Sequence, residues 1–175
     1  MSWTPLCSSP PCKPCLRCRP IFGLRIQHTC VPPYFVQINP MLILTLLQSV
    51  VDFILQSNPR NPPHPVHKHG VPAYIIGRGS GAFNWSSVAE AIIASPTSFN
   101  LVDPPLRDGF LTSATTTDFS WTVIRYEAPV NTVTFMHCHI NEHLFGGMAV
   151  ALLEGADCLP PIPEEYLRFQ QLGTF

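Results

Sequence analysis

Six of the seven histidines in this 175-residue chain lie in two short clusters, where their imidazole nitrogens are placed to bind metal. The first cluster is HPVHKHG, residues 64–70, and the second is HCHINEHLFGGM, residues 137–148. Together they supply histidine, cysteine and methionine side chains, which are the ligands of a blue-copper electron-transfer site. The sequence therefore predicts copper binding and electron transfer.

The tripeptide His137-Cys138-His139 is able to serve two metal sites if its backbone is extended. In a strand, successive side chains point to opposite faces, so the two imidazoles share one face and the thiolate takes the other. The same alternation places His67 and His69 together and His64 on the opposite side, provided that Pro65 leaves the geometry regular. We therefore expect two centres about one sheet thickness apart, ~10 Å, with the cysteine backbone linking them.

One expected centre has the ligands of a trigonal copper site. The turn after the extended segment His137-Cys138-His139 is expected to bring His143 back towards His64 and Cys138. Met148 is then placed to approach as a weak axial thioether. The other centre contains imidazoles alone, from His67, His69, His137 and His139. A structural zinc site matches this set poorly, because zinc is bound by cysteine, histidine and carboxylates rather than by methionine.

The segments that carry these clusters are predicted strands. Residues 50–55 are rich in β-branched and aromatic side chains and lead towards the first cluster, while residues 130–136 deliver the chain to the second. Further strands are expected at 74–78, 121–126 and 149–153, with a weak helix at 86–95 and a loop over 100–117. This pattern predicts a mainly β fold, a Greek-key sandwich or barrel with short helices in its connections.

The composition fits one domain of ordinary size with a substantial core. Hydrophobic residues make up 46% of the chain and charged residues 12%, while 20 prolines favour turns and extended segments over a helical bundle. The net charge of −1 gives no attraction to nucleic acid or to an anionic membrane. The strongest apolar run, residues 41–55, is too short and too polar to span a bilayer. We expect neither nucleic acid nor a membrane as a partner.

The first 40 residues are predicted to be an irregular leader ahead of a copper-binding domain over residues 41–175. Prolines punctuate this leader and it shows no apolar periodicity, although it contains Cys7, Cys12, Cys15, Cys18 and Cys30. A C-x2-C-x2-C metal or cluster site is the alternative, but no further ligand-rich segment is left to complete it. Cys158 is expected to be a single thiol. Residues 1–20 show no apolar run of the kind that a secretory signal needs.

The segments HPVHKHG and HCHINEHLFGGM resemble the two copper motifs of the third, C-terminal cupredoxin domain of multicopper oxidases, the family of laccases, ascorbate oxidases and ferroxidases. The similarity extends over residues 50–166, and the segments NPPHPVHKHG, RDGF and WTVIRY look closest to fungal laccase-like members. It implies that the type 1 copper, the site of substrate oxidation, is held by His64, Cys138, His143 and Met148. It also implies that half of the ligands of a trinuclear cluster, where dioxygen is reduced to water, are His67, His69, His137 and His139.

The resemblance covers one part of such an oxidase. The family's other cluster ligands come from two His-x-His pairs in its first domain, and here only the isolated His28 remains unassigned. The implied partners are therefore the missing N-terminal domains, dioxygen and a small aromatic reducing substrate. We expect the chain alone to be inactive as an oxidase, because four-electron reduction of dioxygen needs the whole cluster. The resemblance also implies a secreted, extracellular enzyme, although this chain shows no signal peptide.

Several residues depart from the usual pattern of the family, among them Val71, which stands where the family often has a second histidine or a similar residue after the glycine. Lys68 stands where the family often has leucine, so the packing of the first cluster is expected to differ. Met148 occupies the axial position, where many fungal laccases have leucine or phenylalanine. A coordinating thioether favours the oxidised metal more than an apolar residue does, which implies a lower reduction potential and easily oxidised donors such as catechols and hydroquinones.

Three alternatives stay open at this point. A single-domain cupredoxin electron carrier needs only the type 1 ligands and would leave four histidines without a role. A ferroxidase-type oxidase often has glutamate directly after the isoleucine of the HCHI motif, where this chain has Asn141 followed by Glu142. An inactive, truncated remnant with an exposed apolar interface is the third, and it would be prone to association.

Overall fold

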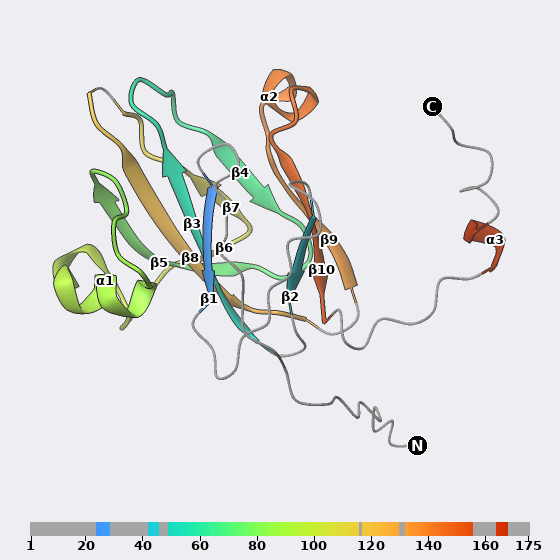
Figure 1. Ribbon diagram of the computed structural model, residues 1–175, viewed down its shortest axis with the longest axis horizontal. Helices are drawn as coiled ribbons and strands as arrows, with labels where there is room; N and C mark the ends of the chain where they lie inside the picture. Colours follow the sequence, from blue (N-terminus) through green and yellow to red (C-terminus); the bar gives the residue numbers. More distant parts are fainter. Residues whose placement is uncertain are drawn as a thin grey trace, which may run out of the picture.

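The computed structural model describes residues 24–28, 42–45, 49–115, 117–129, 132–155 and 164–167, with side chains for residues 49–115, 117–129, 132–155 and 164–165. These segments form two five-stranded β-sheets packed as a sandwich, with short helices in the connections (Figure 1). The mainly β sandwich expected from the sequence is confirmed.

The first sheet has the strand order β1-β3-β8-β5-β6, and all its neighbouring strands are antiparallel. Its strands are β1 (Leu24–His28), β3 (Val50–Ser57), β5 (Ala73–Ser80), β6 (Leu106–Arg107) and β8 (Ser120–Glu127). Trp121 of β8 lies directly on Gly79 of β5, where a Cβ atom would overlap the indole ring. A glycine is needed at that position because the two strands carry this close contact.

The second sheet contains both histidine clusters. Its strand order is β2-β10-β9-β4-β7, in which the β2–β10 pair is parallel and the others are antiparallel. Its strands are β2 (Leu42–Thr45), β4 (Pro65–Lys68), β7 (Gly109–Leu111), β9 (Thr132–Cys138) and β10 (Ala149–Glu154).

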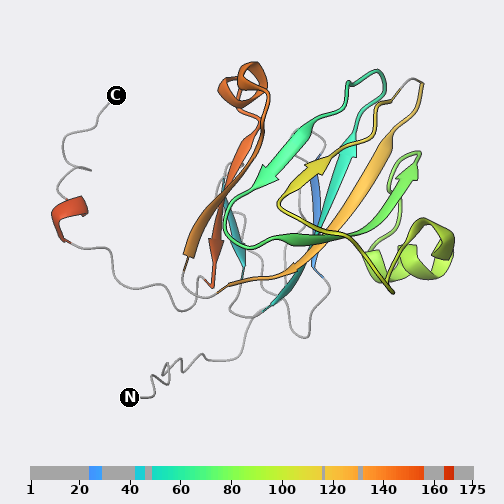
Figure 2. The same ribbon diagram turned by 180° about the vertical axis from the view of Figure 1, so that it is seen from behind.

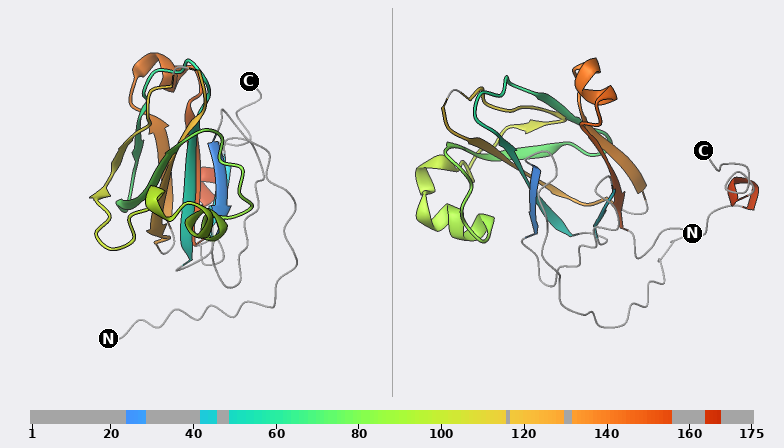
Figure 3. Two further views of the ribbon diagram at one scale, coloured as in Figure 1. Left: turned by 90° about the vertical axis from the view of Figure 1, so that its left-hand side faces the viewer. Right: turned by 45° about the horizontal axis from the view of Figure 1, so that its top comes forward.

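The short helices lie at different ends of the sandwich. Helix α1 (Val88–Ala94) is followed by the 3₁₀ turn η1 (Pro96–Ser98) on the side of the first sheet, and α3 (Glu164–Leu167) lies near the chain's end. Helix α2 (Asn141–Phe145) stands above the ends of β9 and β10 (Figure 2). Both views of Figure 3 show α1 and α2 on well-separated parts of the sandwich.

The core is divided into two clusters by the first sheet. The larger cluster lies between the sheets and includes Val51, Phe53 and Leu55 of β3. The smaller one packs α1 against the other face of the first sheet and includes Ile54. Both faces of β3 are therefore covered, which explains why its apolar run shows no clean alternation.

Some short elements were not expected from the sequence. Strands β6 and β7 lie inside the predicted loop over 100–117, because each is too short to show a period and forms only by pairing with β5 or β4. Strand β1 falls inside the predicted leader, and the domain division at residue 40 stays a prediction. The five N-terminal cysteines and Cys158 lie outside the described residues. Among the described helices, none combines the length and apolar character that crossing a membrane requires.

Candidate metal centres

Strands β4 and β9 bring the two histidine clusters together. Their antiparallel register places His67 opposite His137 and Val66 opposite Cys138. Because side chains alternate along both strands, the two paired histidines point to the outer face of the sheet and Cys138 points inward. Cys138 is accordingly buried, with 1% of its surface exposed.

Three donor atoms converge at the inner end of β9. Cys138 Sγ lies 3.5 Å from His143 Nδ1 and 3.8 Å from His64 Nδ1, and the two Nδ1 atoms are 3.1 Å apart. With metal bonds of about 2.0 Å to nitrogen and 2.3 Å to sulfur, trigonal ligands would be roughly 3.5–3.7 Å from one another. The donor set and its spacing therefore fit a trigonal metal site, and the His-Cys-His group is consistent with type 1 copper.

Backbone hydrogen bonds fix His64 just before β4 begins. Its N–H donates to Thr112 Oγ1 at 2.9 Å, and its carbonyl accepts from the N–H of Thr112 at 3.0 Å. Burial, and then repulsion from His143, lower the pKa of His64 below its ordinary value. The ring is thus kept neutral at neutral pH, which is the form that binds a metal.

Helix α2 returns His143 to the site. After the helix the N–H of Met148 donates to the carbonyl of His143 at 2.9 Å, and the N–H of Cys138 donates to the carbonyl of Met148 at 3.0 Å. Gly147 supports this turn with a φ of 93°, a conformation that favours glycine. The backbone of Met148 is therefore tied to both neighbouring ligands, while an axial role for its half-buried thioether stays a prediction.

The other four histidines of the two clusters gather on the outer face of the same sheet. His69 Nε2 lies 3.2 Å from His137 Nε2. The ring centroids of five pairs are between 4.8 and 6.0 Å apart, and these pairs involve His67, His69, His137 and His139. Partial burial, followed by repulsion from the other three histidines and Lys68, lowers the pKa of His69.

Two of the outer imidazoles are oriented by backbone carbonyls. His67 Nδ1 lies 3.0 Å from the carbonyl oxygen of Asp108, and His137 Nδ1 lies 2.9 Å from that of Cys138. In the tautomer that donates Nδ1–H to the carbonyl, Nε2 keeps its lone pair for a metal. Both rings thus keep Nε2 as the nitrogen that can bind a metal, and in His137 this is the atom that lies beside His69 Nε2.

The structure therefore brings together the two groups that the sequence predicted, on opposite faces of one sheet. Sequence reasoning missed the supports of these groups, which are Thr112 beside His64 and Asp108 beside His67. It also missed the partner of Lys68, which is the buried Glu154. The strand pattern contained a signal for this contact. Alternation points Lys68 to the same buried face as Cys138, and it points Glu154 to the same buried face as Leu152.

Comparison with known proteins identifies relatives over most of the chain. Residues 33–157 match the family model described as Multicopper oxidase. The chain is 39% identical over 136 residues to multicopper oxidase elcG of Phaeosphaeria nodorum, an alignment that covers 77% of this chain and 22% of the relative. It is 44% identical over 133 residues to laccase ustL of Ustilaginoidea virens, covering 72% and 20%.

Among solved structures, the laccase of Botrytis aclada shares this fold, with a TM-score of 0.54 at 23% identity over 75% of this chain and 22% of the laccase. The cupredoxin type of the sandwich is thereby confirmed. The chain spans about a fifth of the length of the relatives that it matches.

Proposed function

The chain belongs to the multicopper oxidase family, and we propose that it is the C-terminal copper domain of a laccase-type enzyme. In the complete enzyme, His64, Cys138, His143 and Met148 would hold a type 1 copper. The chain would also supply His67, His69, His137 and His139 as half of the ligands of a trinuclear cluster. The enzyme would oxidise phenols or aromatic diols in one-electron steps and reduce dioxygen to water.

The observation that carries this proposal is the convergence of Cys138 Sγ with two histidine Nδ1 atoms within 3.8 Å. When bound there, copper supplies one-electron redox chemistry. The protein holds the three donors through the backbone bonds to Thr112 and Met148, and it excludes water from the sulfur by burying Cys138. A ligand set held in place by backbone hydrogen bonds changes little between two oxidation states, which favours rapid electron transfer.

The outer imidazoles favour an oxidase over a single-domain electron carrier, which would need only the inner group. His137 and His139 are bonded through the backbone to Cys138, so a short covalent path joins the buried sulfur to the outer group. This path suits a protein in which electrons taken up at one centre are used at another. A ferroxidase remains the alternative within the same family.

We infer that the N-terminal domains of the complete enzyme cover the outer face of the second sheet and contribute the remaining cluster ligands. The register places Val133, Phe135 and His137 on one face of β9, beside the small and apolar residues Ala151 and Leu153 of β10. Val133 is 63% exposed in this chain. An apolar sheet face that ends in imidazoles fits a partner that buries the face and completes the metal site.

Copper loading of the purified chain tests this proposal. The chain should develop an intense blue thiolate-to-copper absorption band and should show no oxidase turnover with a phenolic donor. Cys138→Ser should lose the band, and Cys138→Ser is well matched because it changes only sulfur to oxygen. A colourless copper-loaded chain would refute the type 1 assignment. Dioxygen consumption that depends on Cys138 would refute the expected inactivity of the chain alone.

A further inference from the structure

Lys68 lies between two outward histidines of the first cluster, yet its own side chain points into the core. Its surface is 1% exposed. The Nζ atom lies 3.2 Å from Glu154 Oε1, and both side chains are fully buried. The same ammonium group donates to the carbonyl oxygen of His69 at 3.2 Å and lies 4.2 Å from the ring centroid of Tyr126. A buried cation thus contacts the backbone of a predicted copper ligand.

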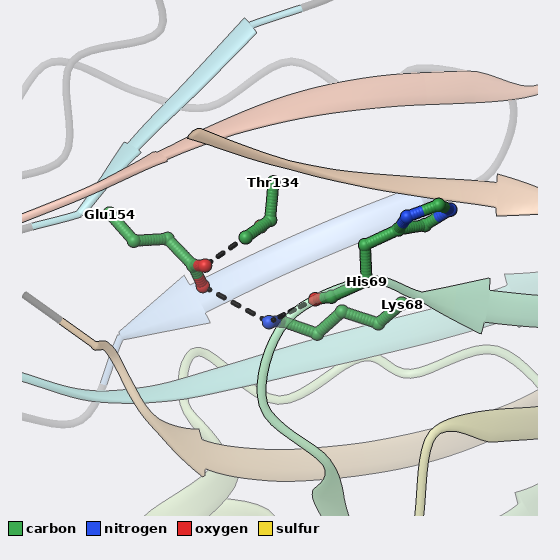
Figure 4. A network of polar contacts seen from close by, with 4 residues as sticks. All are labelled: Lys68, His69, Thr134 and Glu154. Atoms are coloured by element: carbon green, nitrogen blue, oxygen red, sulfur yellow. Dashed lines mark hydrogen bonds and ion pairs between the residues drawn. The ribbon is translucent and has the colours of Figure 1, made fainter. Parts of the chain in front are cut away.

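Further contacts extend this group across three strands of the second sheet. Thr134 Oγ1 of β9 donates to Glu154 Oε2 of β10 at 2.7 Å, and Glu154 in turn binds Lys68 of β4. Figure 4 shows this chain of contacts, with the ring of His69 directed away from it. We call Lys68, Thr134 and Glu154 the polar clamp. Tyr126 packs against it from the first sheet.

The clamp lies in apolar surroundings and is not explained by stability alone. Its neighbours on the inner face include Met136 and Leu152, which belong to the larger core cluster. Burial lowers the pKa of Lys68, and attraction to the Glu154 carboxylate opposes that shift. Replacing a buried ion pair with apolar residues of similar size is often neutral or stabilising, because desolvation offsets the attraction. Added stability is therefore a weak explanation for the clamp, and its contacts point to a role in fixing the local geometry.

The clamp contacts the backbone of His69, the residue that directly follows β4. The N–H of His69 donates to the carbonyl of Phe135 at 2.8 Å, and its carbonyl accepts from Lys68. Gly70 follows with a φ of 83°, and a Cβ atom there would be 2.8 Å from Thr134 Cγ2. The chain thus turns away from the strand next to the polar clamp. The Nε2 atom of the His69 ring lies 3.2 Å from Nε2 of His137.

We propose that Lys68 is a positioning residue for His69, acting with Glu154 and Thr134 as a buried polar clamp that holds the His69 imidazole against His137. The value of this position to a copper cluster rests on the proposed function. The fixation of the His69 backbone does not rest on it, because it is a property of the metal-free chain.

Amide hydrogen exchange of the metal-free chain tests the fixation. The apolar triple variant Lys68→Met/Thr134→Val/Glu154→Leu should unfold at the same or a higher denaturant concentration, while the His69 amide exchanges about tenfold faster through local opening. Val123→Ala in the smaller core cluster is the matched control, which should lower global stability and leave local exchange at His69 unchanged. An unchanged His69 exchange rate in the triple variant would overturn the proposal.

Thr134→Val alone covers the case in which the triple variant fails to fold. It is nearly isosteric and removes the hydrogen bond to Glu154, so exchange at His69 should again be faster than in the parent chain. If His69 keeps its protection when this bond is lost and the chain stays folded, the clamp does not hold that residue.

Copper binding by the outer imidazoles tests the consequence. With Cys138→Ser in both chains to silence the inner site, the triple variant should bind Cu(II) roughly tenfold to a hundredfold more weakly, the usual effect of removing groups that support ligands. The Cu(II) paramagnetic resonance spectrum should also change. Equal affinity and equal spectra would overturn the positioning role. If the Cys138→Ser chain without the triple substitution binds no copper at these imidazoles, the proposed function fails. Hydrogen exchange at His69 still tests whether the polar clamp holds that residue.

Discussion

Cys138 and His137 are consecutive residues of β9 that face two different centres. The Cys138 sulfur lies 3.5 Å from His143 Nδ1 on the inner side, and His137 Nε2 lies 3.2 Å from His69 Nε2 on the outer side. Between the two side chains there is only a peptide unit. The pleat of one strand therefore separates the centres in space while keeping them a few bonds apart.

This separation predicts that the centres can be emptied independently. His137→Ala should lower the copper content of the chain and leave the blue absorption band in place, because its imidazole takes no part in the inner group. Cys138→Ser should do the opposite, removing the band while copper still binds outside. Metal analysis alongside absorption spectroscopy checks both variants. Loss of the blue band in His137→Ala would show that the two groups are not separable.

The lowered pKa of His64 predicts that the metal-free chain loses stability in mild acid. Its folded pKa lies below the unfolded value of about 6.5, so the unfolded state binds more protons. The contribution of this group is thus fully present above the unfolded pKa and is lost as the pH falls through the folded pKa. Urea unfolding between about pH 8 and pH 5 measures the effect. In His64→Leu the pH dependence should be smaller, and an equal slope would contradict the assignment.

A substitution of Thr112 tests how His64 is held in place. Thr112→Val removes the acceptor of the buried His64 N–H and should cost about 1–2 kcal/mol in unfolding free energy. It should also shift the blue band of the copper-loaded chain. Thr115→Val is the comparison. The Thr115 hydroxyl accepts from the N–H of Asn61 and donates to the carbonyl of Asn58, in a more exposed position where water can replace both bonds, so its cost should be smaller than that of Thr112→Val. Chemical denaturation and absorption spectra of both variants settle the comparison.

Gly70 predicts a steric effect next to the outer group. Gly70→Ala adds a Cβ atom 2.8 Å from Thr134 Cγ2 to a backbone with positive φ, and should cost more than about 2 kcal/mol. Gly81→Ala has nearly the same φ, 84°, but its nearest contact is 3.9 Å away, so it should show the conformational cost alone, about 1–2 kcal/mol. Equal losses in thermal or denaturant unfolding would mean that contact with Thr134 is unimportant.

Secretion of the complete enzyme, which the family resemblance implies, predicts a glycan on Asn84. This residue is exposed and begins the triplet Asn84-Trp85-Ser86, an acceptor sequence for N-glycosylation. Expression through a eukaryotic secretory pathway should give a band of reduced gel mobility that a glycosidase removes and that Asn84→Gln lacks. A secreted chain with unmodified Asn84 would contradict the prediction.

Residue alternation carried most of the sequence-based prediction of the sites. The order His-Cys-His in an extended segment is enough to separate the sulfur from the two rings, and the structure shows that separation at β9. The longer strands were also predictable, because five or more residues suffice to display β-branched and aromatic character.

The supports of the sites could not be predicted in the same way. Strand β7 has three residues and exists because β4 pairs with it, and α2 has five residues without a side-chain cap at its start. The partnership of Lys68 with Glu154 depends on the order of strands in the sheet, which alternation alone does not give. Tertiary pairing, and not local preference, determines these features.

The short edge segment over residues 108–112 touches both centres. Asp108 accepts from the His67 ring and from the N–H of Lys68, while Thr112 brackets His64 with two hydrogen bonds. The two centres thus share support from one edge segment, in addition to the covalent link through the backbone of Cys138. A displacement of this edge segment would therefore change the support of His64 in the inner group and of His67 in the outer group together.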